Sequence, residues 1–468
     1  MTGAGAPQRS QRIQPARRVA YEVINAVRES DAYANLLLPV KLERAGLSGP
    51  DAGLATELTY GTLRKQGYYD AVIAIAAGRS PDQIDPAVLD VLRLACHQLL
   101  SMRVAPHAAV DEAVNQAREV ASRSATGFVN GVLRTVTRTT PDEWRARVLS
   151  NPRNEDERLS LEHSHPVWIV RAFRQALAAE GRADELEDLL EADNRAPKVT
   201  LVALPGLASV REVAGERKAK FSPLAAVSDG GDPANLTGVR DGRVRVQDEG
   251  SQLAALALSR ARPIKAGERW LDLCAGPGGK AALLAAEAQS SGATLVANEV
   301  IPARAQLVRN ALAVFAEPPQ VLVQDGTTFG ASLPEQFDRI LIDAPCTGLG
   351  ALRRRPEARW RKQPRDVPQL AALQAELLNS GLAALKPGGL LAYVTCSPHL
   401  GETRLIVENA LKLSGGTVVQ LNTAEVLQKV AIYPLDLGAS ETSVQLWPHR
   451  HGTDAMFICL LQKLPTTD

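Results

Sequence analysis

The stretch Ile340-Leu-Ile-Asp343-Ala-Pro-Cys346-Thr-Gly348-Leu-Gly350 decides the fold of the second half of the chain. Its apolar start predicts a buried strand, because a short apolar run bounded by turn residues is typical of a strand that is covered on both faces. The proline and the glycines that follow predict a loop. The strand is therefore expected to deliver the carboxylate of Asp343 and the thiol of Cys346 to its carboxyl end.

Two further apolar runs end at residues that can carry chemistry. Residues 270–273 run into the turn Gly276-Pro-Gly278-Gly279-Lys280, which precedes a helix rich in alanine and leucine. Residues 390–395 stop at a second thiol, Cys396. Ligands of open parallel α/β sheets bind beyond the carboxyl ends of the strands. The three strand ends are therefore expected to face one site.

Strands and helices alternate from about residue 243 to residue 463, which predicts a doubly wound α/β domain over 243–468. The expected parallel strands are 270–273, 294–298, 321–324, 340–342 and 390–395. Two late runs, 443–447 and 455–461, are expected to add an antiparallel hairpin to this sheet. Cys459 lies inside the last run, and its expected role is burial.

The front of the chain has a helical pattern. Apolar residues recur at three- and four-residue spacing, for example over 20–27 and 87–94, which predicts an all-α bundle over 15–141. Pro86 and Asp111 are expected near helix starts, and Cys96 is expected to be buried. Residues 1–14 are interpreted as a disordered tail. Residues 142–242 combine helical pieces, one strand candidate and a Gly/Asp-rich loop, and are interpreted as a connecting subdomain.

Composition limits the possible functions. The formal net charge of +1 gives no global attraction to polyanions, so a nucleic acid would have to be bound by local basic patches. The 5 cysteines are an odd number in no paired spacing, which favours a reducing cytoplasm over a secreted disulfide framework. No apolar run approaches the roughly 20 residues that span a bilayer. A soluble monomer is expected.

The glycine turn at 276–280 is typical of a cofactor site, and three classes of cofactor compete for it. A dinucleotide site requires G-x-G-x-x-G, which Gly276, Gly278 and Gly279 do not supply in full. A P-loop requires Ser or Thr after the lysine, where this chain has Ala281. The remaining class is S-adenosylmethionine.

Acidic residues after successive strands favour S-adenosylmethionine. Glu299 follows the second expected strand, where a carboxylate can accept from both ribose hydroxyls, and Asp325 follows the third, near the adenine. Lys280 would neutralise the methionine carboxylate. A solvated loop is the default interpretation of any one acid, but acids at successive strand ends reverse that preference.

The thiols of Cys346 and Cys396 allow three interpretations. They are buried structural cysteines, a pair of metal ligands, or catalytic nucleophiles. Because no further Cys or His lies at ligand spacing, the sequence does not support a metal site, and no metal is expected. In the third case a thiolate adds to C6 of cytosine and makes C5 nucleophilic enough to accept a methyl group. One cysteine attacks and the other assists release, but the residues alone do not rank the two.

Four motifs in this order resemble the bacterial 16S ribosomal RNA cytosine-5 methyltransferase B family (Sun/Fmu-like). They are Gln247-Asp-Glu249, Leu271-Asp-Leu-Cys-Ala-Gly-Pro-Gly-Gly-Lys280, Asp343-Ala-Pro-Cys-Thr-Gly-Leu-Gly350 and Thr395-Cys-Ser397. The helical front resembles a NusB-like RNA-binding domain through Arg18-Val-Ala20, Glu57-Leu-Thr-Tyr60-Gly-Thr-Leu63-Arg64, His107-Ala-Ala-Val110-Asp-Glu112-Ala-Val114 and Phe128-Val-Asn130-Gly-Val-Leu133-Arg134. The resemblance covers nearly the whole chain and implies a Rossmann-like methyltransferase domain.

The resemblance also implies roles for residues. Cys396 would be the nucleophile, Cys346 would promote release, and Asp343 would touch the target base. The residues expected to line the cofactor are Cys274, Ala275, Gly276, Pro277, Gly278, Gly279, Lys280, Glu299, Asp325 and Asp343. The chain departs from the family at Ala281, at Glu299 and at Ser397-Pro398-His399, and the last departure puts base positioning in doubt.

Basic residues beside the expected site suggest how RNA is held. A charge run is usually a solvated face, but next to Cys346 it could follow phosphates while an interleaved tryptophan stacks on a base. The candidate RNA contacts are Arg353, Arg354, Arg355, Arg359 and Trp360, with Arg64 and Arg134 in the helical front.

The sequence therefore predicts a cytosolic S-adenosylmethionine-dependent methyltransferase that acts on C5 of a cytosine in RNA, with 16S rRNA as the expected target. A DNA cytosine methyltransferase is disfavoured because no large target-recognition insert separates Cys346 from Cys396. A non-catalytic RNA-binding or ribosome-assembly factor remains a second hypothesis. The target nucleotide, and the choice between naked rRNA and an assembly intermediate, are not set by the sequence.

Overall fold

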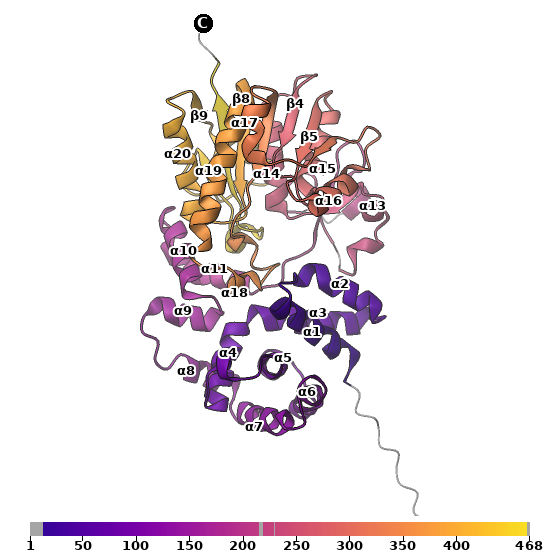
Figure 1. Cartoon of the computed structure of the whole chain (residues 1–468), viewed down its shortest axis with the longest axis vertical. Helices are drawn as coiled ribbons and strands as arrows, with labels where there is room; N and C mark the ends of the chain where they lie inside the picture. Colours follow the sequence, from indigo (N-terminus) through magenta and orange to yellow (C-terminus); the bar gives the residue numbers. More distant parts are fainter. Residues whose placement is uncertain (1–12, 215–218, 229, 466–468) are drawn as a thin grey trace, which may run out of the picture. The chain divides into compact units, whose positions relative to one another are not determined.

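The computed structural model of the chain describes residues 13–214, 219–228 and 230–465 (Figure 1). It divides into two compact units. The first holds the chain up to Val170 together with Arg354–Trp360, and the second holds Arg171–Arg353 and the chain from Arg361 onward. The expected tail at 1–14 lies largely outside the described residues. The expected connecting subdomain at 142–242 contributes to both units.

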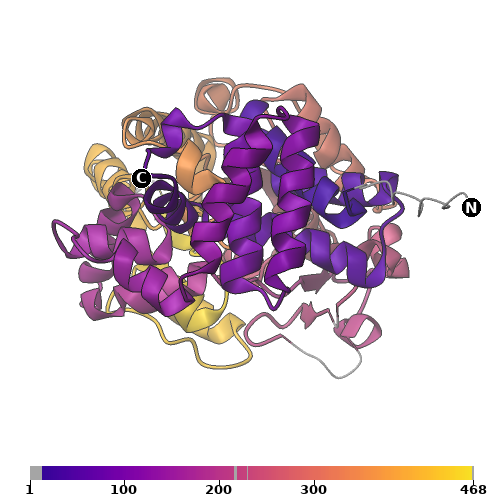
Figure 2. The same cartoon turned by 90° about the horizontal axis from the view of Figure 1, so that it is seen from below.

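The first unit is a helical bundle, as predicted (Figure 2). Its helices are α1 (Pro15–Glu29), α2 (Ala34–Arg44), α3 (Gly49–Arg64), α4 (Gln66–Ala77), α5 (Pro86–Ser101), α6 (Pro106–Val120), α7 (Ala125–Thr137), α8 (Pro141–Val148) and α9 (Glu155–His163). Their apolar faces form one core, which includes Cys96. The spacing of apolar residues therefore predicted this unit correctly.

Helix starts in the first unit follow local chemistry. Asp85 caps α5, because its carboxylate accepts from the backbone N–H of Ala87 at 2.9 Å and of Val88 at 3.2 Å, and Pro86 occupies the first turn. The prediction for Asp111 was wrong. This residue lies inside α6, which begins at Pro106, because proline is better suited than a mid-segment acid to the first turn.

The second unit is built on a mixed sheet, drawn from pink to yellow in Figure 1. The strand order is β10-β11-β8-β7-β4-β5-β6, with β9 paired to β11. The strands are β4 (Arg269–Asp272), β5 (Thr294–Asn298), β6 (Gln320–Leu322), β7 (Phe337–Asp343), β8 (Leu385–Thr395), β9 (Val418–Gln420), β10 (Ser443–Gln445) and β11 (Phe457–Lys463). β4, β5, β6, β7 and β8 pair with one another in the parallel sense, whereas every pair that includes β9, β10 or β11 is antiparallel.

Both faces of the central strands are buried, which explains their unbroken apolar sequence. In β8, Ala392 and Val394 belong to one core, with α14 (Glu249–Arg260) and α15 (Gly279–Gln289), while Leu391 and Tyr393 face the other core. Alternate residues of a strand point to opposite faces. The second core is covered by α19 (Asp366–Ala384) and α20 (Arg404–Leu413).

Some strands were predicted correctly, and others were missed. The late hairpin is confirmed, because β10 pairs with β11 and β11 pairs with β8. Cys459 is fully buried, as expected. The prediction missed β9 and two strands of a separate three-stranded sheet, β2 (Ala225–Val227) and β3 (Val244–Val246), which flank β1 (Thr200–Ala203). These strands have three residues each, too few for a recognisable period.

A buried arginine fastens α14 to the sheet. Arg339 of β7 is fully buried and pairs with Glu268 at 2.8 Å. The same guanidinium donates to the carbonyls of Leu258, Ser259, Arg262 and Pro263 at the end of α14 and just beyond it. It therefore satisfies backbone acceptors that the helix cannot satisfy internally.

We expect Arg339→Ala to lower the free energy of unfolding by roughly 3 kcal/mol or more, because it leaves Glu268 as an uncompensated buried charge. Urea denaturation measures the change. Arg269→Ala, at a more exposed position in the neighbouring strand β4, is the matched control and should change stability by less than about 0.5 kcal/mol. Equal effects of the two substitutions would contradict the role given to Arg339.

Candidate functional site

Three neighbouring strands of the sheet end at the same edge. β7 lies between β4 and β8 and runs parallel to both, so Asp272, Asp343 and Thr395 end adjacent strands. The loops that follow carry the glycine turn, Cys346 and Cys396. The register pairs Asp343 with Val394, which sets the two thiol loops side by side.

The two thiols meet at this edge. The sulfur atoms of Cys346 and Cys396 are 3.4 Å apart, and both side chains are partly exposed. The hydrogen bond with Cys396, followed by burial, raises the pKa of Cys346 well above its ordinary value. Cys346 therefore holds its proton at neutral pH, and the pair can exchange a proton directly.

Lys280 and Asp343 lie beside the thiols. The ammonium of Lys280 donates to Asp343 at 2.8 Å, rather than extending from the turn as an isolated charge. Burial alone would lower the pKa of Lys280, but the negative charge of Asp343, followed by Cys396 and Asp272, raises it above the ordinary lysine value. Lys280 therefore stays protonated beside the two thiols.

The glycine turn fits the approach of a ligand to backbone. Gly278 has φ of +109° and is the N-cap of α15, so the first N–H groups of that helix face outward. At Gly276 a Cβ would stand 2.1 Å from a carboxylate oxygen of Glu299, so a larger residue there would displace the Glu299 side chain. Cys274 and Ala275 precede the turn, and Pro277 lies within it.

The two expected ribose and adenine acids differ in their surroundings. Glu299 is 4% exposed, accepts from the backbone N–H of Ile301 at 3.0 Å and pairs with Arg304 at 3.5 Å. Asp325 is exposed and accepts from both the backbone and the hydroxyl of Thr327, which lowers its pKa. Each carboxylate follows its strand, as the prediction required.

Two further site residues, Asp272 and Gln247, were named by the sequence analysis only as parts of motifs, and no role was predicted for them. The side-chain oxygens of Asp272 and Gln247 are buried and lack a well-formed hydrogen-bond partner among the described residues. Burial, followed by the negative charge of Asp343, raises the pKa of Asp272 to about 8. Gln247 faces Gly279, since its side chain lies 3.8 Å from a Cβ built there. Unpaired acceptors beside the turn fit the ammonium of an amino-acid moiety such as that of S-adenosylmethionine.

Comparison with known proteins places the chain in a family. Residues 261–462 match the family model described as 16S rRNA methyltransferase RsmB/F, and residues 14–138 match the NusB family. A Mycobacterium tuberculosis protein with methyltransferase in its name is 47% identical, over 99% of this chain and 100% of its own. The chain belongs to the RsmB/F family of 16S rRNA methyltransferases. The fold and the family predicted from the sequence are thereby confirmed.

Two further comparisons agree with this family. Ribosomal RNA small subunit methyltransferase B of Escherichia coli O157:H7 is 30% identical, over 84% of this chain and 89% of its own. The solved structure titled PH0851 has 25% identity and a TM-score of 0.78, and the match covers 97% of this chain and 99% of that one. Among the described residues, no helix is both long enough and apolar enough to cross a membrane.

Several residues predicted to contact RNA in this RsmB/F chain are instead buried, and their side chains bond to or pack against other parts of the protein. Arg353 is 6% exposed and donates to the carbonyl of Gly452 at 3.0 Å. In the first unit, Arg359 is fully buried and donates to the carbonyls of Arg64 and Ser164 at 2.8 Å and 3.1 Å. The ring of Trp360 lies where a Cβ on Gly67 would stand, at 2.5 Å. In this conformation these side chains support the fold.

The remaining basic candidates are more accessible. Arg355 is exposed and its guanidinium lies 5.3 Å from the ring centre of Tyr33. Arg134 is exposed near the end of α7, and Arg354 is half-buried. Arg64, by contrast, is buried over the ring of Tyr60. Contact with phosphate is therefore better supported for Arg355 and Arg134 than for Arg64, Arg353 or Arg359.

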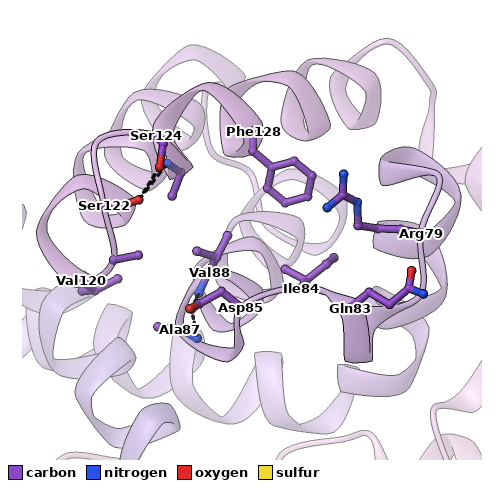
Figure 3. Close-up of a pocket in the computed structure, with 12 residues that line it drawn as sticks. Arg79, Gln83, Ile84, Asp85, Ala87, Val88, Val120, Ser122, Ser124 and Phe128 are labelled. Carbon is purple, nitrogen blue, oxygen red and sulfur yellow. Dashed lines mark hydrogen bonds between the residues drawn. The ribbon is translucent and has the colours of Figure 1, made fainter.

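The first unit also contains an open cavity of about 630 Å³ (Figure 3). Arg79 lies over the ring of Phe128, 4.9 Å from its centre. The hydroxyls of Ser122 and Ser124 are 2.8 Å apart, and Asp85, which caps α5, also lines the cavity. Most of the polar side chains that line this cavity therefore already have a partner within the first unit.

Gly350 leaves no room for a side chain between the thiol loops. A Cβ there would stand 2.0 Å from the carbonyl oxygen of Ala455 and 2.9 Å from that of Cys396. We expect Gly350→Ala to destabilise the protein by about 1–3 kcal/mol, as overpacking does, because backbone must move. Thermal unfolding measures this loss. Gly348→Ala is a poor control because φ there is +73°, whereas Gly127→Ala lies in an open helical position and should be neutral.

Proposed function

We propose that this chain transfers a methyl group from S-adenosylmethionine to C5 of a cytosine in 16S rRNA, through a covalent bond between Cys396 and C6. The approach of the Cys346 and Cys396 sulfurs to 3.4 Å carries the proposal. Buried structural cysteines would not need partly exposed sulfurs beside an ion pair, and no third ligand accompanies them in the described residues to make a metal site.

The two thiols are suited to different roles. Lys280 favours the thiolate of Cys396, which attacks C6 of the ring and makes C5 nucleophilic. S-adenosylmethionine, when bound, supplies an electrophilic methyl group for C5. Cys346 keeps its proton because its pKa is raised, so it can donate that proton to N3 of the ring as Cys396 attacks C6. The Cys346 thiolate left behind can take the C5 proton after methyl transfer, while the Cys396–C6 bond breaks and N3 loses its proton to solvent. Electrons of the C5–H bond return to the ring as the thiolate departs.

The residues around the turn are suited to the cofactor. Glu299 and Asp325 provide acceptors for hydroxyl and amino groups, and Asp272 and Gln247 provide acceptors beside the helix start. Lys280 provides the cation. Asp343 is paired with Lys280 and lies three residues before Cys346, so it can accept from the exocyclic amino group of a cytosine.

The RNA substrate has to present an unstacked cytosine. A thiol reaches C6 only when the base leaves its stack, which costs a few kcal/mol and is easiest in a loop. Arg355 and Arg134 are exposed cations for the phosphates.

Bisulfite sequencing of rRNA from cells with and without the gene tests the proposal. We expect one or a few cytosines of 16S rRNA to lose protection when the gene is deleted, and to regain it with the wild-type gene. Purified protein with S-adenosylmethionine labelled in the methyl group should label the same nucleotide. Unchanged protection at every cytosine would refute the proposed function.

A further inference from the structure

A buried carboxylate joins the two thiol loops. Glu402 is fully buried and accepts from the backbone N–H of Thr347 at 2.7 Å and from its hydroxyl at 2.5 Å. It also accepts from the hydroxyl of Ser397 at 2.6 Å. Thr347 directly follows Cys346, and Ser397 directly follows Cys396. The residue after each thiol is therefore bonded to the same side chain.

Glu402 is itself held in place. It ends a short helical turn, η6 (Leu400–Glu402), and its backbone N–H donates to the carbonyl of His399 at 2.9 Å. Its carbonyl accepts from the hydroxyl of Tyr393 in β8 at 2.9 Å. Gln374 of α19 donates to the carbonyl of Pro345 at 2.8 Å, which fixes the other side of Cys346. The carboxylate is thus tied to the rigid sheet.

A buried carboxylate persists only where donors satisfy it, and here the donors come from two separate loops. Loss of the acceptor would leave the Thr347 N–H and two hydroxyls without this partner. The loops would still be joined by the bond from the Gly350 N–H to the Cys396 carbonyl at 2.9 Å, but the residues that follow the two thiols would lose their shared anchor, and the separation of the sulfur atoms would be less closely fixed. Misplacement of reacting groups by about 1 Å can cost about 100-fold in rate.

We propose that Glu402 is a positioning residue that holds the loops of Cys346 and Cys396 together, so that both sulfur atoms reach one base. The catalytic consequence rests on the proposed function, whereas the structural consequence does not. The unusual Ser397-Pro398-His399 stretch is therefore followed by a carboxylate that connects the two thiol loops.

Steady-state kinetics test the catalytic consequence. We expect Glu402→Ala to lower kcat about 100-fold while KM for RNA and for S-adenosylmethionine changes less than about twofold, and Glu402→Gln to recover part of kcat through its remaining acceptor. Thr403→Val is the matched control. Thr403 is a buried neighbour whose hydroxyl donates to the carbonyls of His399 and Leu400, not to the Glu402 carboxylate or to Thr347 or Ser397. Wild-type kcat in Glu402→Ala would overturn the proposal.

A second measurement does not depend on methyl transfer. Glutathione disulfide can oxidise Cys346 and Cys396 to one protein disulfide, releasing two molecules of glutathione thiol, and the equilibrium gives the effective concentration of one thiol at the other. Peptide mapping by mass spectrometry identifies the pair. We expect Glu402→Ala to lower this effective concentration about tenfold or more relative to wild type and to Thr403→Val.

The outcomes test the positioning role of Glu402 separately from the proposed methyltransferase function. An unchanged or increased effective concentration in Glu402→Ala would overturn the positioning role, whether or not the protein methylates RNA. A wild-type protein that methylates no cytosine, with the effective concentration lowered as expected, would refute the proposed function alone. If Glu402→Ala does not fold, the double variant Thr347→Val/Ser397→Ala keeps the carboxylate, and wild-type behaviour of that variant would also overturn the proposal.

Discussion

Replacing Cys396 with alanine should abolish methyl transfer to RNA. The thiolate that forms the bond to C6 is lost, and C5 of cytosine alone is too weak a nucleophile to accept the methyl group. We expect a loss of at least about 1,000-fold in kcat/KM, as for removal of other catalytic nucleophiles. Transfer of labelled methyl groups to rRNA measures the effect. Cys459→Ala is the control, because Cys459 is fully buried in β11.

Cys346→Ala should behave differently. Cys396 still attacks, but the group that exchanges protons beside it at 3.4 Å is missing, so release slows. We expect a protein–RNA adduct that survives denaturing gel electrophoresis, with none in the Cys396→Ala/Cys346→Ala double variant. If the adduct instead formed in Cys396→Ala, the roles of the two thiols would be exchanged.

The same variants separate an enzyme from a non-catalytic assembly factor. If the protein acted only by binding RNA, Cys396→Ala would complement a deletion strain as well as wild type, because substitution of a partly exposed sulfur leaves the basic surfaces intact. Under the proposed function, complementation and bisulfite protection fail together. This comparison decides between the two classes with a single substitution.

The central sheet was predictable because its strands are covered on both faces. The expected strand at 294–298 coincides with β5, and the thiols were correctly expected on adjacent strand ends. The predicted strand boundaries were wrong where pairing with a neighbouring strand extends a strand beyond its apolar run. β8 begins at Leu385, well before the expected 390, because Leu385 pairs with Phe337 across a register shift that spans the glycines. Glycine in a strand interior hides such an extension.

The supporting contacts of the site could not be read from the sequence. Glu402 and Thr347 are 55 positions apart, and only the fold brings them together. Arg359 lies in an arginine-rich run that is typical of an exposed surface. Its side chain is nevertheless fully buried and donates to a backbone carbonyl of the first unit. Asp272 was visible as an acid at the end of an apolar strand. Its complete burial, which raises its pKa, could not be predicted from the sequence.

Asp272→Asn should stabilise the protein at high pH. Burial and Asp343 raise the folded-state pKa of Asp272 to about 8, whereas an unfolded aspartate titrates near 4. Between these values the unfolded chain binds fewer protons than the folded one, so stability falls as pH rises and this contribution is lost by about pH 8. Asparagine cannot ionise, so we expect a gain on the order of 5 kcal/mol at pH 8 and almost none at pH 4.

Urea denaturation of both proteins from pH 4 to pH 9 measures this difference, and Asp325→Asn should show the opposite sign. The pKa of exposed Asp325 is lowered by its hydrogen bonds with Thr327, so that carboxylate stabilises the fold above its unfolded pKa and loses this effect as pH falls. Parallel curves for wild type and Asp272→Asn would show that Asp272 ionises normally in the folded protein. A stabilised Asp272→Asn protein with weakened binding of S-adenosylmethionine would instead mean that the chain retains a destabilising buried acid because the cofactor needs it.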